Sequence, residues 1–517
     1  MSVVVQEAVV PAGTARSSVV TLISSAVGAG VLSFPFALRC TGWAAGLACI
    51  AGIASVEAFT LYVLTKVAEQ TGASSYSALV NRMLGRGGSL VMSAVIFAYC
   101  FGSCIAYLII IGDSFRPILL ELFGHAWWTS RAAVIAGVGC GVVLPTCFRT
   151  RLGALQAVSA LCFYGLLGVT GIVLWRADEI LSSPDYSWDP VQAFNAHPSF
   201  LTALPIIVFG FHCHTNVISV WEELGPRPSF FRPASPLSLA EQEDAAAAAG
   251  AAAAAAAAEQ QAAAEHEAQY PIQQQEQGEE RQAGRRGIGS QQPNGRRPKS
   301  EKLVGMARIV AAAVGITALF YSVVGLAGYL AFPANTQSNI TLNFPEDDPL
   351  VQVARAMVGL IQLAAYPINH FPARGALRDL AQHVTGHAPA GPGFVAAETL
   401  AFFTATLALA LAIDDLGSIF KLVGGTCGSI LILTMPGALL MRYAMSTQAA
   451  AAADAGLHAP LLAEAGASAG VHPLPLRQAA YSAWRSKYFW TGLVLVVASA
   501  ALGVLTVATT LHPLPPP

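Results

Sequence analysis

The chain has 517 residues, of which 54% are hydrophobic and only 11% are charged. A soluble domain carries about 25% charged residues, so this composition excludes an ordinary soluble protein. The net charge of −2 gives no indication of a nucleic-acid partner. The apolar residues are grouped in blocks of about 20, the length that a helix needs to cross the hydrocarbon core of a bilayer. The sequence therefore predicts an all-α, multi-pass integral membrane protein in contact with lipid.

The apolar blocks predict about 11 transmembrane helices, called spans 1 to 11 in chain order. They cover residues 17–38, 43–66, 88–115, 131–148, 153–175, 199–221, 304–332, 350–371, 393–413, 417–442 and 488–511. Most of the 28 lysine and arginine residues fall in loops on one side if the N-terminus is cytoplasmic, and positive charge favours the cytoplasmic side. The sequon Asn339-Ile-Thr341 then lies in an outer loop, which agrees with this orientation.

The predicted organisation follows from this orientation. It comprises a cytoplasmic N-terminal tail (1–15), spans 1–6 (16–225), a cytoplasmic linker (226–300), spans 7–10 (301–445), a cytoplasmic low-complexity loop (446–486), and span 11 with a short outer tail (487–517). The linker is rich in Ala and Gln and has no apolar face that could dock on the protein. We expect it to be disordered.

Metal sites, disulfides and enzymatic chemistry have little support in the sequence. The nine cysteines fall in or beside spans, and no Cys-x-x-Cys pair occurs. The trio His212-Cys213-His214 could ligate a metal, but it is isolated, so we expect neither a metal nor a cofactor. No nucleophile and base occur in a catalytic pattern, which indicates that the protein is not an enzyme.

Two spans carry polar or small residues where a lipid-exposed helix would be apolar. Span 1 contains Gly28 and Gly30 followed by Pro35, and span 6 contains Gly210 among polar side chains. A break in a membrane helix leaves amides and carbonyls without partners, and it persists only where it lines a cavity or meets a ligand. Spans 1 and 6 open two halves of five spans each, and matching interruptions indicate the substrate site of an inverted-repeat transporter. A Gly-rich helix contact is the alternative for span 1.

Seven motifs in order resemble the amino acid/auxin permease family, whose members include vacuolar and sodium-coupled neutral amino acid transporters. They are GAGVLSFPFAL (28–38), SYSAL (75–79), AYLIIIGDSFRP (106–117), FHCHTNVISVWEEL (211–224), GLAGYLAF (325–332), YPINHFPARGAL (366–377) and DLGSIFKLVGGTCGS (415–429). The resemblance implies a leucine-transporter-like fold with a 5+5 inverted repeat and broken helices 1 and 6. It also implies amino acid transport.

The two breaks match the chemistry of a zwitterionic amino acid. Backbone amides suit the carboxylate, and free carbonyls suit the ammonium. The predicted substrate-binding residues are Val27, Gly28, Ala29 and Gly30 in span 1, and Phe209, Gly210, Phe211 and His212 in span 6. No side-chain cation is needed, which favours a neutral amino acid. Tyr99 or Tyr107 could flank the substrate side chain.

The coupling ion is open between proton and sodium. In the sodium-coupled branch an Asn of span 1 and a Thr of span 8 help to hold the ion, and these fall on Ser24 and Ala365. Ala offers only its carbonyl, which favours a proton-coupled or ion-independent transporter. His214 titrates near neutrality and Glu57 lies deep in span 2, so these are the alternative proton carriers, although either could be structural.

The sequence predicts a secondary active transporter that moves neutral amino acids by alternating access, coupled to protons. The alternatives are a sodium-coupled transporter and an amino acid sensor that signals through its cytoplasmic segments. The resemblance favours a vacuolar or other endomembrane location, with the plasma membrane as the alternative.

Overall fold

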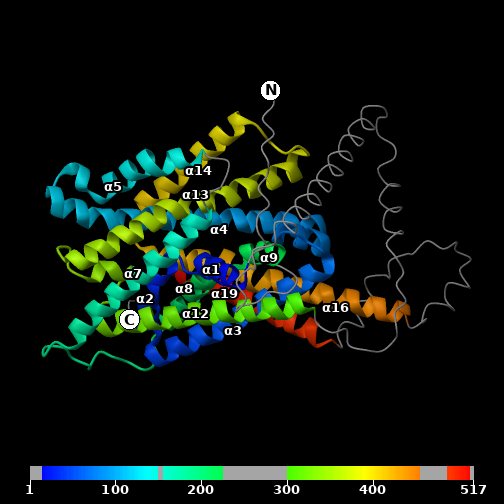
Figure 1. Ribbon diagram of the computed structural model, residues 1–517, viewed down its shortest axis with the longest axis horizontal. Helices are drawn as coiled ribbons and strands as arrows, with labels where there is room; N and C mark the ends of the chain where they lie inside the picture. The colour runs from blue at the N-terminus through cyan, green and yellow to red at the C-terminus, as the bar shows by residue number, and fades with distance from the viewer. Residues whose placement is uncertain (1–13, 149–154, 225–299, 455–485, 513–517) are drawn as a thin grey trace, which may run out of the picture.

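The computed structural model describes residues 14–148, 155–224, 300–454 and 486–512, and every element in these ranges is helical (Figure 1). In the first half of the chain the helices are α1 (Ala15–Ala26), η1 (Ala29–Ser33), α2 (Phe34–Thr41), α3 (Trp43–Thr71), α4 (Tyr76–Phe123), η2 (Trp127–Thr129), α5 (Arg131–Val138), η3 (Gly139–Val143), α6 (Leu144–Cys147), α7 (Leu155–Leu181), α8 (Phe200–Phe211) and α9 (His214–Glu223). In the second half they are α12 (Glu301–Ala331), η4 (Ile340–Asn343), α13 (Pro349–Thr385), α14 (Pro392–Ala412), α15 (Leu416–Val423), η5 (Gly424–Gly428), η6 (Ile430–Thr434), α16 (Met435–Asp454) and α19 (Lys487–Leu511).

The predicted spans coincide with these helices. Among the described residues, eight helices are long and apolar enough to cross a membrane, and the bent pair of α1 with η1–α2 can make a ninth. The two remaining predicted blocks fall on the shorter apolar helix Arg131–Cys147 and on α7. The all-α multi-pass architecture predicted from the sequence is therefore confirmed. The predicted linker and most of the predicted loop 446–486 lie outside the described residues, although α16 continues into that loop as far as Asp454.

Polar caps set where several helices begin. Thr14 accepts a hydrogen bond from the Ser17 amide at the start of α1, and Ser300 accepts one from Leu303 at the start of α12. Asp348 caps α13 by accepting from the amides of Leu350 and Val351. These side chains satisfy amides that the first turn of a helix leaves without partners.

Counterpart spans of the two halves pack side by side. The most extensive contact between helices joins α4 with α13, which are spans 3 and 8, and α3 likewise packs on α12, which are spans 2 and 7. Figure 1 shows α4 and α13 lying along each other, with α5 and α14 beyond them, while α1, α2 and α8 lie between this group and α3 with α12. The two broken spans also meet, through contacts of α2 and η1 with α8. Pairing of spans five apart is the arrangement expected of a 5+5 repeat.

Both predicted breaks are present, and one lies further along the chain than expected. Span 1 bends by 53° between Ala15–Ala26 and Gly30–Thr41. Span 6 continues as helix through Gly210 to Phe211, and the interruption falls at His212 and Cys213. The prediction of a break at Gly210 was therefore wrong by two residues, because Gly210 serves as a contact point between helices instead.

The loop before α13 is held by buried polar contacts. Arg355, 1% exposed, donates to the carbonyls of Thr341 and Phe344 at 2.9 Å each. The side chain of Asn339 is 1% exposed and donates to Asp113, so the sequon asparagine is enclosed in the folded protein. Burial alone would raise the pKa of Asp348, but hydrogen bonds from Arg176 and from two backbone amides together hold it below its ordinary value.

Candidate functional site

The two breaks meet at a close backbone contact. A Cβ atom built on Gly30 would lie 3.0 Å from the Cα atom of Gly210, which is backbone rather than a movable side chain. A Cβ on Gly210 would lie 2.6 Å from the ring of Phe34. Both positions therefore require glycine for the broken spans to approach this closely. A Cβ on Gly28, by contrast, would meet no other atom within 4 Å.

The backbone groups predicted to bind the substrate are partly occupied by other partners. The amide of Val27 donates to Ile23 at 2.7 Å, and the amide of Gly28 donates to Ala26 at 3.0 Å. Ala29 and Gly30 begin η1, where helix geometry leaves amides without intrahelical partners. Of the four predicted amides, those of Ala29 and Gly30 are therefore the better placed to receive a carboxylate.

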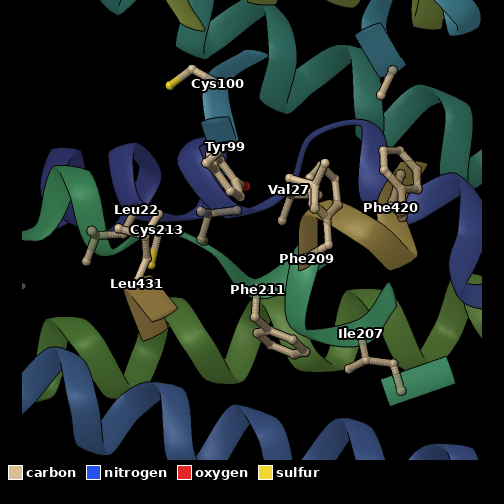
Figure 2. Close-up of a cluster of buried hydrophobic side chains, with 14 of the residues drawn as sticks. Leu22, Val27, Tyr99, Cys100, Ile207, Phe209, Phe211, Cys213, Phe420 and Leu431 are labelled. Carbon is tan, nitrogen blue, oxygen red and sulfur yellow. The ribbon is translucent and has the colours of Figure 1, made fainter. Parts of the chain in front are cut away.

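An aromatic cluster lies beside the span 6 break. Phe209 stacks on Phe420 at a ring distance of 4.4 Å, and Tyr99 lies 5.8 Å from Phe209 and 4.2 Å from His212 (Figure 2). The structure thus selects Tyr99 rather than Tyr107, whose hydroxyl accepts from Asn369. Phe211 points away from this cluster toward α12.

Some of the buried polar atoms without a hydrogen-bond partner lie around the breaks. Both ring nitrogens of His212, which is 5% exposed, have no hydrogen-bond partner among the described residues. The same holds for Oε1 of Gln362, on α13. Gln362 lines a cavity of about 10 Å³ together with Val27 and Gly28, room for roughly one water molecule. Since a buried polar group without a partner costs about 1–3 kcal/mol, such groups are typical of a binding site rather than of a packed core.

The two proton candidates, Glu57 and His214, form one pair. His214 Nδ1 lies 3.2 Å from Glu57 Oε1, and both side chains are 0% exposed. Cys213 donates its thiol proton to the same oxygen at 3.4 Å. The second carboxylate oxygen, Oε2, has no partner among the described residues. Glu57 of span 2 and His214 of span 6 therefore lie in one site. The sequence had suggested them as alternative proton carriers.

Thr60 sets the tautomer of His214. The Thr60 hydroxyl lies 2.9 Å from His214 Nε2, and it also lies 3.0 Å from the carbonyls of Val56 and Glu57. Because the hydroxyl gives its single proton to a backbone carbonyl, it accepts from Nε2–H. We therefore assign the proton of the neutral ring to Nε2. Nδ1 then faces Glu57 Oε1 at 3.2 Å, and the two atoms make no hydrogen bond in this arrangement.

The two predicted sodium-ligand positions lie on either side of this region. Ser24 is in α1, and Ala365 is in α13. The carbonyl of Ala365, its only oxygen for an ion, accepts from Asn369 Nδ2 at 3.5 Å.

A second buried cluster joins α6, α13 and α14. Glu398 of α14 accepts from His370 Nε2 at 2.9 Å and from Arg374 Nε at 2.7 Å. Arg374 also donates to Thr399 and to the carbonyl of Cys147, each at 2.8 Å. The cluster joins spans 4, 8 and 9, and both oxygens of its carboxylate are paired. No local pattern in the sequence indicated this burial.

Several residues of the site escaped the sequence reasoning. Thr60, Tyr321, Gln362 and Phe420 each sit in an apolar span without a local motif that marks it. For Thr60 a usable signal existed, because it follows Glu57 by three residues and therefore shares its helix face. The other three are identified only by contacts between distant spans.

Buried polar groups around two facing helix breaks define a multi-pass membrane protein built to bind a polar solute. The model of the family described as "Transmembrane amino acid transporter protein" matches residues 11–240 and 292–456, so the chain belongs to this family. The chain is 25% identical over 458 residues to the sodium-coupled neutral amino acid transporter 7 of Homo sapiens, covering 84% of this chain and 82% of the relative. The Xenopus laevis protein of the same name is 25% identical over 456 residues, covering 84% and 81%.

A shorter match and two solved structures complete the comparison. The putative amino acid transporter AAT1 of Toxoplasma gondii is 31% identical over 215 residues, or 41% of this chain and 29% of the relative. The Eremococcus coleocola manganese transporter has a TM-score of 0.46 at 11% identity, covering 100% of this chain and 92% of its own. A Na+-coupled sialic acid symporter has a TM-score of 0.44 at 11% identity, covering 96% and 89%. Structural likeness at this level carries no argument about function.

Proposed function

We propose that this member of the amino acid transporter family is a secondary active transporter that moves neutral amino acids by alternating access, coupled to protons. Family membership supports the amino acid substrate. The proton rests on one observation, the buried contact between Glu57 and His214 at the span 6 break. Its position beside the break lets a change in proton occupancy act on the substrate site.

In this proposal the substrate lies between the breaks. Its carboxylate meets the amides of Ala29 and Gly30 at the positive end of η1, and its ammonium meets carbonyls at the end of α8. Tyr99 and Phe209 flank the side chain. Aromatic neighbours without a fixed opposing charge favour a neutral side chain over a charged one.

In this proposal Glu57 and His214 take up the coupled proton on one side of the membrane and release it on the other. His214 Nδ1 and Glu57 Oε2 both lack a hydrogen-bond partner among the described residues, so either atom can take up a proton. Each pH unit across the membrane is worth about 1.4 kcal/mol per proton, a tenfold concentration ratio. A potential of 100 mV adds about 2.3 kcal/mol. One proton per neutral amino acid therefore supports useful accumulation.

Sodium coupling is the second candidate, because the relatives in the comparison are named as sodium-coupled transporters. Against it, Ala365 offers only a carbonyl, and that carbonyl already accepts from Asn369. A sensor without net flux is the third candidate, and the cytoplasmic segments that would signal lie outside the described residues. A vacuolar or other acidic endomembrane is the proposed location, because such membranes maintain the pH gradient that the pair would use.

Flux in proteoliposomes tests the proposal. Purified protein is reconstituted, and uptake of each of the twenty radiolabelled amino acids is measured with an inward proton gradient in choline buffer. We expect uptake of at least one neutral amino acid, and we expect replacement of choline by sodium to leave it unchanged. Binding without flux would identify a sensor, and a tenfold rise on adding sodium would overturn proton coupling.

A further inference from the structure

The side chain of Tyr321, on α12, reaches both broken spans. Its hydroxyl oxygen lies 2.8 Å from the carbonyl oxygen of Ala26 and 2.7 Å from that of Gly210. Ala26 is the last residue of α1, and Gly210 lies in the last turn of α8. One hydroxyl therefore joins the ends of the two half-helices that lead into the breaks.

The ring of Tyr321 is fixed from two sides. It is 0% exposed, stacks on Phe34 at a ring distance of 4.0 Å, and meets the edge of Phe211 at 5.2 Å. Phe34 begins α2 and Phe211 ends α8. Phe34 of span 1 and Phe211 of span 6 thus hold the Tyr321 ring in place. The Tyr321 hydroxyl is thereby kept against both breaks.

The hydroxyl cannot satisfy both carbonyls. A tyrosine hydroxyl carries one proton, so it donates to Ala26 or to Gly210 but not to both at once. Both carbonyls also lie at the C-terminal ends of helices, where partial negative charge collects. The Ala26 carbonyl also accepts from the Gly28 amide at 3.0 Å, but the Tyr321 hydroxyl is the one side chain that reaches both carbonyls among the described contacts. The point between the two carbonyls therefore combines two acceptors and negative potential with one neutral side-chain donor.

An α-ammonium group fits this point better than a hydroxyl does. It brings three N–H donors and a positive charge, so it can donate to both carbonyls at the same time. We propose that the Tyr321 hydroxyl occupies the position of the substrate ammonium while the site is closed, and that the substrate must displace it. Tyr321 is then a competing internal ligand that lowers substrate affinity and releases the two half-helices when the substrate binds. This inference rests on the proposed function.

The variant Tyr321→Phe removes the competing donor and keeps the stacked ring. Uptake kinetics are measured in proteoliposomes with the amino acid that the wild type takes up fastest from the panel of twenty. We expect KM to fall by about threefold to tenfold, the worth of one neutral hydrogen bond. The matched control is Tyr329→Phe on the same helix, whose hydroxyl accepts from the Gln192 amide away from the breaks at 2.9 Å. Its KM should stay at the wild-type value.

A raised KM in Tyr321→Phe would show that the hydroxyl is a ligand of the substrate, and an unchanged KM would show that it only packs. Either result overturns the inference. If Tyr321→Phe does not yield folded protein, Phe34→Leu keeps the hydroxyl but weakens the stack that places it, and its KM should also fall. Absence of uptake by the wild type would refute the proposed function itself, which separates the two failures.

Discussion

Two glutamate–histidine pairs are buried in this protein, and they differ in what surrounds them. Glu398 and His370 share their site with Arg374, and each carboxylate oxygen of Glu398 has a partner. Glu57 and His214 have no arginine or lysine contact among the described residues, and Oε2 of Glu57 is unpaired. The arginine keeps its proton at any physiological pH, so it holds Glu398 ionised. Glu57 has no such partner.

This difference indicates a structural role for the Glu398 cluster and agrees with the proton-carrying role that we propose for Glu57 and His214. A carboxylate fixed by arginine gains nothing from exchanging a proton, and it joins α6, α13 and α14 into one unit. A carboxylate that contacts an imidazole and a thiol, but no fixed positive charge, can change its proton occupancy at modest cost. Glu398 and His370 lie on α14 and α13, whereas His214 lies where span 6 is interrupted. Proximity to a break, rather than burial, therefore distinguishes the pair that we propose as the coupling site.

The largest effect is expected from removing the arginine. Arg374→Met leaves the Glu398 carboxylate buried beside His370 without a fixed positive charge, and breaking a buried pair costs about 3–5 kcal/mol. We expect a large fall in the melting temperature of the detergent-solubilised protein. The double variant Arg374→Met/Glu398→Gln should recover part of the loss, since no unpaired charge remains. A wild-type melting temperature for Arg374→Met would contradict the structural role of this cluster.

The next effect concerns the backbone contact between the breaks. Gly30→Ala places a methyl group 3.0 Å from the Gly210 Cα atom, and overpacking of this kind costs about 1–3 kcal/mol. We expect uptake to be lost while the protein still inserts. Gly28→Ala is the matched control because its added methyl group meets open space, and it should retain at least part of the uptake. Equal loss in both variants would mean that the glycines act through backbone flexibility and not through packing.

A smaller effect is expected at Thr60. Thr60→Val keeps the shape of the side chain but removes the oxygen that accepts from His214 Nε2. Both the neutral and the protonated ring lose the hydrogen bond from Nε2–H, but the bond from the charged ring is the stronger one. The pH of half-maximal uptake should therefore move lower by roughly half to one unit. Thr65→Val is the control on the same helix, since the Thr65 hydroxyl bonds only to the Tyr62 carbonyl among the described contacts. A shift to higher pH would refute the assigned tautomer.

The smallest effect is expected from the linker. Deletion of residues 235–295 should leave uptake and its pH dependence unchanged, because this sequence has no apolar face that could pack on the helices. The measurement is uptake per milligram of reconstituted protein against the full chain. A selective loss of transport with normal reconstitution would give the linker a working role.

The sequence predicted the helices and the two broken spans because both signals lie within one stretch of the chain. A run of about 20 apolar residues indicates a span, and small or polar residues inside that run indicate a break. It placed the span 6 break at Gly210, since a glycine among polar residues suggests a break. The structure instead uses Gly210 for close packing against Phe34 and Gly30. The pairing of Thr60 with His214 joins residues 154 apart. Such a contact depends on how spans 2 and 6 cross, which no local pattern contains.

The central claim is that Glu57 and His214 carry the coupled proton, and a proton flux measurement tests it most directly. A pH-sensitive dye is enclosed in proteoliposomes, and the transported amino acid is added outside at equal pH in sodium-free buffer. We predict that the lumen acidifies with the wild type and with His370→Gln. Glu57→Gln and His214→Gln should show no acidification, yet should still exchange labelled for unlabelled substrate between equal pools. Amino-acid-driven acidification that persists in Glu57→Gln and His214→Gln, or uptake that requires sodium and moves no proton, would contradict the account.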